Sequence, residues 1–427
     1  MAESIIQPEN MVSELATGLV GSEIIKIAGE INARIADGEP ITNLTIGDFN
    51  PGIFPLPDVL LQEIIAAYRA GHTNYPQANG MEVLRDSVAG YIAERQGLAY
   101  SKDDVLISGG ARPLIYATYR TVVNRGDKVV FPVPSWNNNH YTYQNFADPV
   151  IVETLPGNRF LPTAEDLRPH VQDAALIALC SPLNPTGTSF TENELAAICD
   201  LILEENRRRE GRKPLYLLYD QIYWALTLGE TGHVDPVSLR TEMREYTIFI
   251  DGISKAFAAT GVRVGWAFGP NLIMQKMRAL LSHVGAWAPK PEQIAVSKFL
   301  QNESAVDSVI LRHRRMISER VRKLFSGFSA LKETGHPVEA IEAEGAMYLT
   351  VKIDLIGRTT DNGELLSDAE DVTMFLIREA KLGIVPFYCF GASRQNPWFR
   401  VSVGTLRSED VSKVIENLRE ALSPFRK

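Results

Sequence analysis

The sequence predicts an α/β protein with a large domain, whose mainly parallel seven-stranded sheet is flanked by helices, and a smaller α+β domain after it. Two observations support this prediction. From about residue 104 onward, short β-rich runs alternate with helical patterns, which is typical of parallel sheets. Several of these runs are almost entirely apolar, as strands covered by helices on both faces must be.

The expected strands cover residues 105–108, 128–132, 150–154, 175–179, 215–219, 247–251 and 264–268. Helical patterns lie between many of them. In the helix expected at 191–207, Thr191 and Glu194 have the spacing of a capping box, in which each side chain bonds the other residue's backbone amide.

A second domain is expected in the C-terminal part of the chain. Residues 292–331 predict one long helix, and strands are expected at 345–352, 382–386 and 399–403, with helices between them. We therefore divide the chain into an N-terminal segment at 1–54, a large domain at 55–305 and a small domain at 306–427. The N-terminal segment is expected to pack on the small domain or on a partner subunit.

Composition narrows the classes of function. The 427 residues are 45% apolar and 22% charged, which suits a large core under a solvated surface. The formal net charge of −9 gives no basic footprint for nucleic acid. No run reaches the ~18 apolar residues that span a bilayer, so no membrane association is expected.

Cysteine and histidine usage points to the cytoplasm and away from metals. Cys180, Cys199 and Cys389 are odd in number and form no CxxC pair, and the seven histidines are scattered. A disulfide framework or a metal site is therefore not expected, and a reducing compartment fits.

Glycines and an aromatic residue follow the first two strands, at the sheet edge where α/β proteins bind ligands. Gly109, Gly110 and Ala111 stand between the first strand and a helix, so their backbone amides could hold a phosphate. An ordinary tight turn is the alternative. Trp136 follows the second strand and could stack on a planar ring, although most such tryptophans are core residues.

Asn184 and Asp220 follow the fourth and fifth strands. Pro182 and Pro185 bracket Asn184, so the loop is stiff and suited to aim one amide at a fixed target. A turn with Asn at a permissive position is the plainer alternative. Asp220 is costly to bury unless a cation or a donor meets it, and capping a helix is its common alternative role.

Lys255 follows the sixth strand among small and apolar residues, and Arg263 comes shortly after it. Poor hydration lowers the pKa of a lysine and leaves a neutral amine that attacks aldehydes, whereas most lysines extend to the surface instead. Together these features fit one ligand: an anion cradle, a flat aromatic, an amide, a carboxylate, a desolvated amine and an arginine. That ligand is a planar pyridinium aldehyde with a phosphate.

Four motifs, in this order, make the chain recognisable over almost its whole length: Asn184-Pro185-Thr186-Gly187, Asp220-Gln221-Ile222-Tyr223, Ser254-Lys255 with Gly261-Val262-Arg263-Val264-Gly265, and Arg400-Val401-Ser402-Val403-Gly404-Thr405. The chain resembles the class I/II aminotransferases of pyridoxal-phosphate fold type I, the group similar to aspartate aminotransferase. The resemblance implies transfer of an amino group between an L-amino acid and a 2-oxo acid by a ping-pong mechanism, with pyridoxal 5'-phosphate as cofactor.

The resemblance also implies a role for each matching residue. Lys255 is the Schiff-base lysine that moves the substrate's α-proton, and Asp220 pairs with the ring nitrogen. Arg400 and the amide of Gly47 bind the substrate carboxylate. The other matches are expected to hold the cofactor: Asn184 and Tyr223 at the phenolic oxygen, Trp136 on the ring face, and Gly110, Ala111, Arg263 and Tyr75 at the phosphate.

Tyr75 matches a tyrosine that acts on the neighbouring subunit's phosphate, which implies a homodimer with shared active sites. One departure from the family is Gly252, because many members have a phosphate-binding serine three residues before the lysine. Ser254 directly precedes Lys255, and whether it takes the place of that phosphate-binding serine stays open.

Specificity also stays open at this level. Lys290 and Arg112 are candidates for the cation that would bind the second carboxylate of aspartate, although a surface lysine and a helix-end arginine are the plainer interpretations. Aromatic residues would equally suit an aromatic or large apolar substrate: Tyr141, Trp224, Trp287 and Tyr348. A carbon–sulfur β-lyase is the alternative enzyme, and a ligand-sensing regulator is a remote alternative, disfavoured by the acidic charge.

Overall fold

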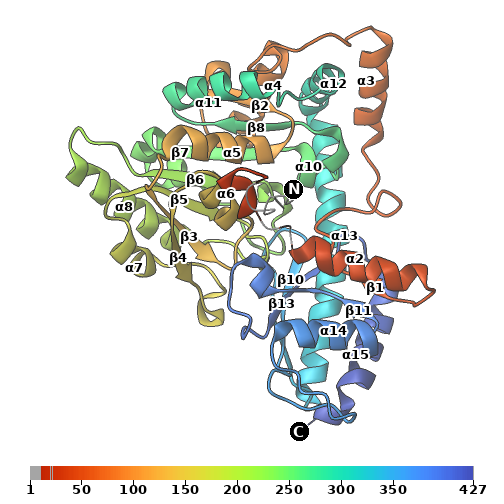
Figure 1. Ribbon diagram of the computed structural model, residues 1–427. Coiled ribbons are helices and arrows are strands. Elements are labelled where there is room, and N and C mark those ends of the chain that lie inside the picture. The colour runs from red at the N-terminus through yellow and green to blue at the C-terminus, as the bar shows by residue number, and fades with distance from the viewer. Residues whose placement is uncertain (1–10, 20, 22, 427) are drawn as a thin grey trace, which may run out of the picture.

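The computed structural model describes residues 11–19, 21 and 23–426. Its large domain is built on one seven-stranded sheet (Figure 1). The strand order is β2-β8-β7-β6-β5-β3-β4. Only β8 runs antiparallel to its neighbours β2 and β7. The predicted mainly parallel sheet is confirmed, and every predicted strand overlaps an observed one: β2 (Val105–Ser108), β3 (Lys128–Val133), β4 (Asp148–Glu153), β5 (Ala174–Cys180), β6 (Tyr216–Asp220), β7 (Thr247–Gly252) and β8 (Gly265–Phe268).

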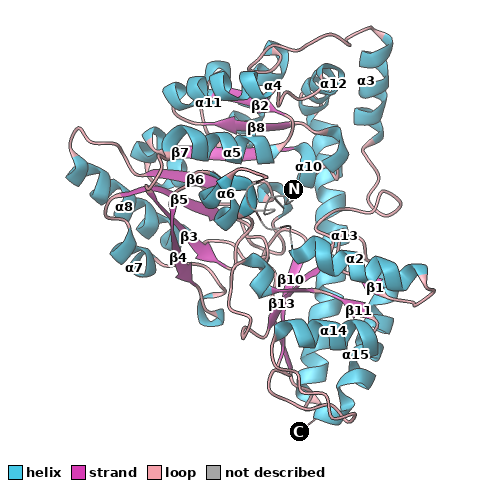
Figure 2. Cartoon of the chain, viewed as in Figure 1, coloured by secondary structure: helices cyan, strands magenta, loops and turns pink. Residues whose placement is uncertain are grey.

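Helices cover both faces of this sheet, as Figure 2 shows. On one face, α5 (Ala111–Val122) and α11 (Asn271–Val284) pack against a core that includes Leu218 and Ile250. On the other, α4 (Glu82–Gln96), α8 (Glu192–Arg209) and α12 (Lys290–Leu300) pack against a core that includes Leu217 and Phe249. Because both faces are buried, the strands read as continuous apolar runs in the sequence.

Shorter helices complete the large domain: α3 (Asp58–Arg69), α6 (Asn138–Gln144), α7 (Ala164–Leu167), α9 (Pro236–Leu239) and α10 (Ile253–Ala256). The capping box predicted for α8 is confirmed. Thr191 Oγ1 accepts a hydrogen bond from the amide of Glu194 at 3.3 Å, and the Glu194 carboxylate accepts one from the amide of Thr191 at 2.9 Å.

The single helix predicted over 292–331 requires correction. The chain forms two helices there, α12 and α13 (Glu303–Glu333). Asn302 starts the second one, because its side-chain oxygen accepts a hydrogen bond from the amide of Ala305 at 3.1 Å. The helical pattern of the sequence continues across the break, so periodicity did not reveal it.

Helix α13 runs through both domains and crosses the boundary expected at 305/306 (Figure 1). Val306 and Ile310 belong to a core of the large domain. Ile317 and Leu324, further along the same helix, belong to the core of the small domain. One rigid element therefore supports both halves of the molecule.

The small domain contains a four-stranded antiparallel sheet of order β12-β13-β10-β9. Its elements are β9 (Val338–Ile341), β10 (Tyr348–Ile353), β12 (Val385–Pro386) and β13 (Trp398–Ser402), with α14 (Ala369–Glu379) and α15 (Val411–Leu422). Strand β9 was not predicted. It is only four residues long and contains a glutamate, so its strand pattern in the sequence is weak.

Residues 23–43 of the N-terminal segment lie against the small domain, whereas its first helix contacts α6 of the large domain, where Tyr143 Oη donates to the carbonyl of Leu15 at 3.1 Å. The segment contains α1 (Glu14–Thr17), α2 (Glu23–Ala36) and β1 (Thr42–Asn43), and β1 pairs in parallel with β11 (Leu382–Gly383). Ile27 and Ile31 of α2 cluster with Ile377 of α14. A hydrogen bond of 2.7 Å joins Lys381 Nζ to the Glu39 carboxylate.

Within the described residues, no helix has the length and apolarity needed to cross a bilayer. The same residues contain no group of three or more His, Cys, Asp or Glu side chains arranged to hold a metal ion.

Candidate active site

The amine of Lys255 lies in the interior at the carboxyl edge of the large sheet, in α10, directly after β7. Its Nζ donates a hydrogen bond of 2.6 Å to the carbonyl oxygen of Gly47. Burial lowers the pKa of Lys255 to about 8, and nearby arginines, Arg400 first among them, act in the same direction, whereas Asp48 opposes them. The share of this amine that is neutral near physiological pH is therefore larger than for an ordinary lysine.

Asp220 ends β6 beside this lysine. Burial raises the pKa of its carboxyl to about 6, while the amide of Ile222 and the charge of Lys255 act in the opposite direction. The amide of Ile222 donates to Asp220 Oδ1 at 3.1 Å. A carboxylate buried this far pairs well with a cationic nitrogen, since an opposite charge offsets its desolvation.

Arg400, on β13 of the small domain, reaches across to the large domain. Its Nη1 donates to Asn184 Oδ1 at 3.0 Å, and its Nη2 donates to the carbonyl of Thr45 at 2.6 Å. Its Nε has no partner within the described structure, and the residue is only 1% exposed. Burial lowers the pKa of Arg400, as expected of a cation without a carboxylate partner, and makes this guanidinium a receptor for an anionic ligand.

Aromatic rings hold Arg400 and face Lys255. The Arg400 guanidinium lies over the rings of Tyr348 and Phe390, with 4.7 and 4.9 Å between its Cζ and the ring centroids. The hydroxyls of Tyr348 and Tyr223 are hydrogen-bonded, and Lys255 Nζ lies 6.0 Å from the centroid of the Tyr223 ring. The sequence suggested Tyr348 only as a neighbour suited to an aromatic substrate, whereas the structure places it in contact with two site residues.

The segment before α5 forms an anion cradle with Arg263. Gly110 has a φ of 99° and precedes the helix without a side-chain cap, so the first helical amides are free to bind a ligand. Arg263 donates to the carbonyl of Gly109 at 2.8 Å and to that of Thr260 at 2.7 Å. A Cβ on Gly110 would collide with this guanidinium, so only glycine lets Arg263 lie so close.

Gly252 leaves no room for a side chain. A Cβ at this position would lie 2.8 Å from Gly265 Cα and 2.9 Å from the carbonyl oxygen of Val264, and backbone atoms cannot give way. The packing of β7 against β8 therefore accounts for the absence of a serine here. Ser254 is buried near the same turn.

Five further residues singled out in the sequence form contacts of their own. Trp136 is partly exposed, and Arg112 stacks over its ring with 5.2 Å between Cζ and the centroid. Tyr75 is 83% exposed and touches Trp287 edge to face, with 5.4 Å between ring centroids. Lys290 is bonded to the Asn74 side chain at 2.7 Å.

Comparison with known proteins agrees with this geometry. Residues 39–418 match the family "Aminotransferase class I and II", and the chain belongs to this family. It is 28% identical over 376 residues to the aspartate aminotransferase of Geobacillus stearothermophilus, with 86% of each protein covered. It is 25% identical over 423 residues to that of Rhizobium meliloti, with 98% of this chain and 97% of the relative covered.

Solved structures show the same fold. An aspartate aminotransferase from Thermus thermophilus with maleate superposes with a TM-score of 0.85 at 24% identity, covering 96% of this chain and 99% of the other. The crystal structure of the aspartate aminotransferase from Rhizobium meliloti gives 0.87 at 23% identity, covering 97% and 99%.

The protein is therefore an aminotransferase that depends on pyridoxal phosphate, as members of this family do. The residues present fit that cofactor. Asp220 is a half-buried carboxylate suited to a protonated ring nitrogen, Lys255 is an amine with a lowered pKa, and the α5 N-terminus with Arg263 is suited to a phosphate.

Proposed function

We propose that this enzyme moves an amino group between an L-amino acid and a 2-oxo acid in two half-reactions, with Lys255 as the residue that carries the proton at the substrate Cα. The buried amine of Lys255 is the observation that supports this most directly. Burial lowers its pKa to about 8, and it lies within the electrostatic influence of both Asp220 and Arg400. A group with a pKa close to the operating pH can both take and return a proton.

When bound, pyridoxal phosphate supplies an aldehyde that condenses with amines and a ring that accepts electrons. Asp220 is proposed to keep the ring nitrogen protonated. Asn184 and Tyr223 are proposed to donate hydrogen bonds to the phenolic oxygen. The amide nitrogen of Asn184 is available for this, since Arg400 bonds its oxygen.

The proposed substrate contacts centre on Arg400. Its guanidinium binds the α-carboxylate of either substrate with two parallel hydrogen bonds, a geometry that lysine cannot provide. Gly47 adds its backbone amide, and a Cβ there would lie 3.0 Å from the Tyr348 hydroxyl and 3.4 Å from Arg400 Nη1. The absence of a side chain thus keeps the space beside Arg400 open.

The remaining proposed contacts hold the cofactor. Gly110, Ala111 and Arg263 bind the phosphate with backbone amides and one guanidinium, and Trp136 covers one face of the ring. Tyr75, exposed in the single subunit, would complete the phosphate site of a second subunit.

For the side chain of the substrate, we propose aspartate or a broad range that includes aromatic amino acids. Arg112 is favoured over Lys290 as the distal cation, because Arg112 is exposed and contributes to the lowered pKa of Lys255, which places it near the reacting amine. Lys290 is instead bonded to Asn74.

We also propose a homodimer in the cytoplasm. Exposed apolar side chains on α3 and α4, which both pack against α12, are available to a second subunit: Val59, Leu61, Tyr68 and Val83. The three cysteines are free, which fits a reducing compartment.

The experiment that tests the reaction replaces Lys255 by Ala and uses the exposed Lys276→Ala as a matched control. Lys255→Ala is expected to lose the visible absorbance of lysine-bound cofactor and to lose turnover, whereas Lys276→Ala keeps both. Full turnover of Lys255→Ala would overturn the assignment.

A panel of amino donors, scored by the spectral change of each half-reaction and by consumption of 2-oxoglutarate, then identifies the substrate. We expect amino-group transfer from aspartate, with a weaker response from aromatic donors. Release of pyruvate from cystathionine without use of a 2-oxo acid would identify a β-lyase instead.

A further inference from the structure

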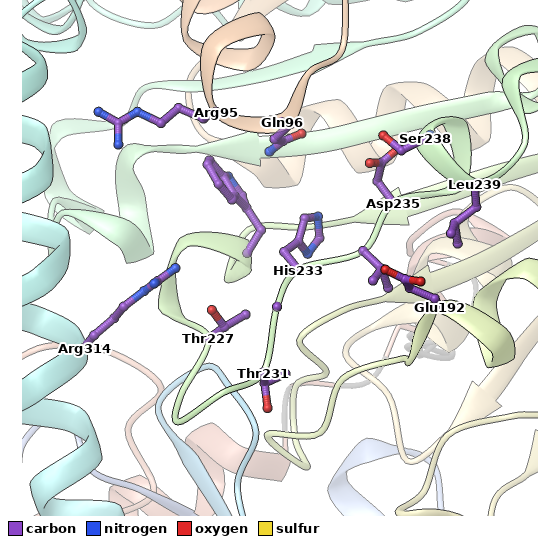
Figure 3. Close-up of a pocket in the computed structure, with 13 residues that line it drawn as sticks. Arg95, Gln96, Glu192, Thr227, Thr231, His233, Asp235, Ser238, Leu239 and Arg314 are labelled. Atoms are coloured by element: carbon purple, nitrogen blue, oxygen red, sulfur yellow. The ribbon is translucent and has the colours of Figure 1, made fainter.

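A pocket beside the candidate active site contains none of the proposed cofactor or carboxylate contacts, and Trp224 is the one aromatic specificity candidate of the sequence that lines it. Its volume is about 400 Å³, within the usual range for small-molecule sites. The C-terminal end of α4, the first turn of α8, helix α13 and the segment from Trp224 to Leu239, which ends in α9, line it (Figure 3). Trp224 also lines it, next in the chain to Tyr223 of the candidate active site, and its indole donates to the buried Asp251 carboxyl at 2.8 Å.

A hydrogen-bonded chain of three side chains reaches the lining of this pocket and leaves two buried polar atoms without a partner. Gln221 Nε2 donates to Gln96 Oε1 at 3.1 Å, so Gln221 Oε1 is an acceptor. His233 Nε2 lies 3.3 Å from that oxygen and must donate to it. His233 Nδ1 is then an acceptor and Gln96 Nε2 a donor, and neither has a partner within the described structure.

The pocket also carries one cation and two acidic side chains without an ion-pair partner among the described residues: Arg314, Glu192 and Asp235, the last of which caps α9 through the amides of Val237 and Ser238. Arg314 donates its Nε to the carbonyl of Ala225 at 2.7 Å, and no carboxylate of the described residues lies within 4.0 Å of its guanidinium. Arg95, by contrast, is paired with Asp307. Glu192 on α8 likewise has no cation within 4.0 Å in the part of the chain that the structure describes. Figure 3 shows Arg314 and Glu192 on opposite sides of the pocket, with His233 between them.

We propose that this pocket binds a free α-amino acid as a second, non-catalytic ligand site. The carboxylate is bound by the Arg314 guanidinium, and Gln96 Nε2 offers a further donor. The ammonium group faces His233 Nδ1 and the Glu192 carboxylate. Trp224, Val234 and Leu239 among the lining residues receive an apolar side chain.

The state of His233 agrees with this assignment. Burial lowers the pKa of His233 to about 3, so the ring is neutral at physiological pH and its Nδ1 offers a lone pair to a cation. An ammonium group is the ligand function that satisfies both a neutral acceptor and a carboxylate.

The test is calorimetric titration of the holoenzyme with L-leucine, in an Arg400→Gln background that weakens binding at the active site. We expect binding to persist in that background. It should weaken about tenfold or more when Arg314→Gln is added, because a charge-assisted hydrogen-bonded contact is lost. Absence of leucine binding in the Arg400→Gln background would overturn the proposal.

A second variant keeps the proposal testable should Arg314→Gln fail to fold. A Cβ at Gly232, which lines the pocket, would meet no heavy atom within 4 Å, so Gly232→Leu adds bulk without a clash at its root. The matched control is Gly157→Leu, where a Cβ is equally unhindered but lies outside the pocket. Gly232→Leu should abolish binding and Gly157→Leu should preserve it, and equal affinity in the two variants would exclude this pocket.

Two leucine analogues test the ligand class. 4-Methyl-2-oxopentanoate lacks the ammonium group and 3-methylbutylamine lacks the carboxylate, and each should bind about tenfold more weakly than leucine. Equal binding of either analogue would contradict the paired recognition of both charges. Leucine should also change the tryptophan fluorescence, and Trp224→Phe should remove that change.

Discussion

At Lys255, three arginine side chains and one carboxylate act on a single amine. Burial lowers the pKa of Lys255 most, and Arg400, Arg112 and Arg263 lower it further, whereas Asp48 raises it. The balance leaves a pKa of about 8, against 10.5 for an ordinary lysine. The reactivity proposed for this residue is therefore set by neighbours that come from both domains.

Asp48→Asn is expected to lower the pKa of Lys255 below about 8, because the substitution removes a negative charge that stabilises the ammonium form. Below its pKa the amine is protonated and does not attack an aldehyde. The rate at which the apoenzyme captures pyridoxal phosphate should thus rise with pH, and its midpoint should move to lower pH in Asp48→Asn. Stopped-flow absorbance measures the capture rate at a series of pH values from about 6 to about 10, a range that spans the expected titration of Lys255.

Asp37→Asn, at an exposed position after α2, is the control for Asp48→Asn and should leave the midpoint unchanged. A midpoint near that of free lysine in the wild type would contradict the lowered pKa.

Several site residues were predictable because each directly follows an apolar strand or stands in a short motif. Asp220 ends β6, and Lys255 comes just after β7. The contacts that join the two domains were not predictable. The Arg400–Asn184 bond joins residues 216 positions apart, and the Tyr348–Tyr223 bond joins residues 125 apart. Pairings at such separation depend on tertiary packing, which no local pattern encodes.

At the scale of elements, burial on both faces made the central strands visible in the sequence, since each is a short apolar run between turn residues. Some short features were not predicted because they give no such run in the sequence. Strand β1 has only two residues and pairs with β11, which lies more than three hundred positions away in the chain. The break between α12 and α13 depends on one capping side chain, that of Asn302.

Thr191→Ala is expected to lower the free energy of unfolding by about 1 kcal/mol, the usual cost of losing an N-cap side chain. The Thr191 hydroxyl accepts from the amide of Glu194 and donates to its carboxylate at 3.0 Å, so alanine removes both bonds at the start of α8. Thr191→Ser keeps a hydroxyl in the same place and should retain most of the stability. Urea unfolding measures both, and equal loss in the two variants would show that the methyl group matters instead.

At the scale of the whole molecule, the two domains cannot be treated as independent units. Helix α13 contributes to both cores, and Arg400 of the small domain bonds Asn184 of the large one. The exposed Tyr75 extends this dependence to a second subunit if the proposed dimer forms. The single chain alone then provides an incomplete phosphate site.

Hybrid dimers test the shared site. A Lys255→Ala subunit paired with a Tyr75→Phe subunit is expected to contain one unaltered site, because the intact lysine and the intact tyrosine come from different chains. The hybrid should therefore bind one cofactor per dimer as tightly as wild type, with visible absorbance, while the Tyr75→Phe homodimer binds more weakly. Tagged subunits purified by two affinity steps allow the comparison. A hybrid no better than Tyr75→Phe alone would place both residues in one chain's site.

The segment from Asp220 to Trp224 faces two compartments at once. Asp220 and Tyr223 belong to the candidate active site, whereas Gln221 bonds two residues of the second pocket and Trp224 lines it. A molecule bound on one side that shifts this segment must change affinity on the other. Thermodynamic linkage makes the effect mutual: whatever factor an occupant of the pocket imposes on cofactor affinity, the cofactor imposes on that occupant.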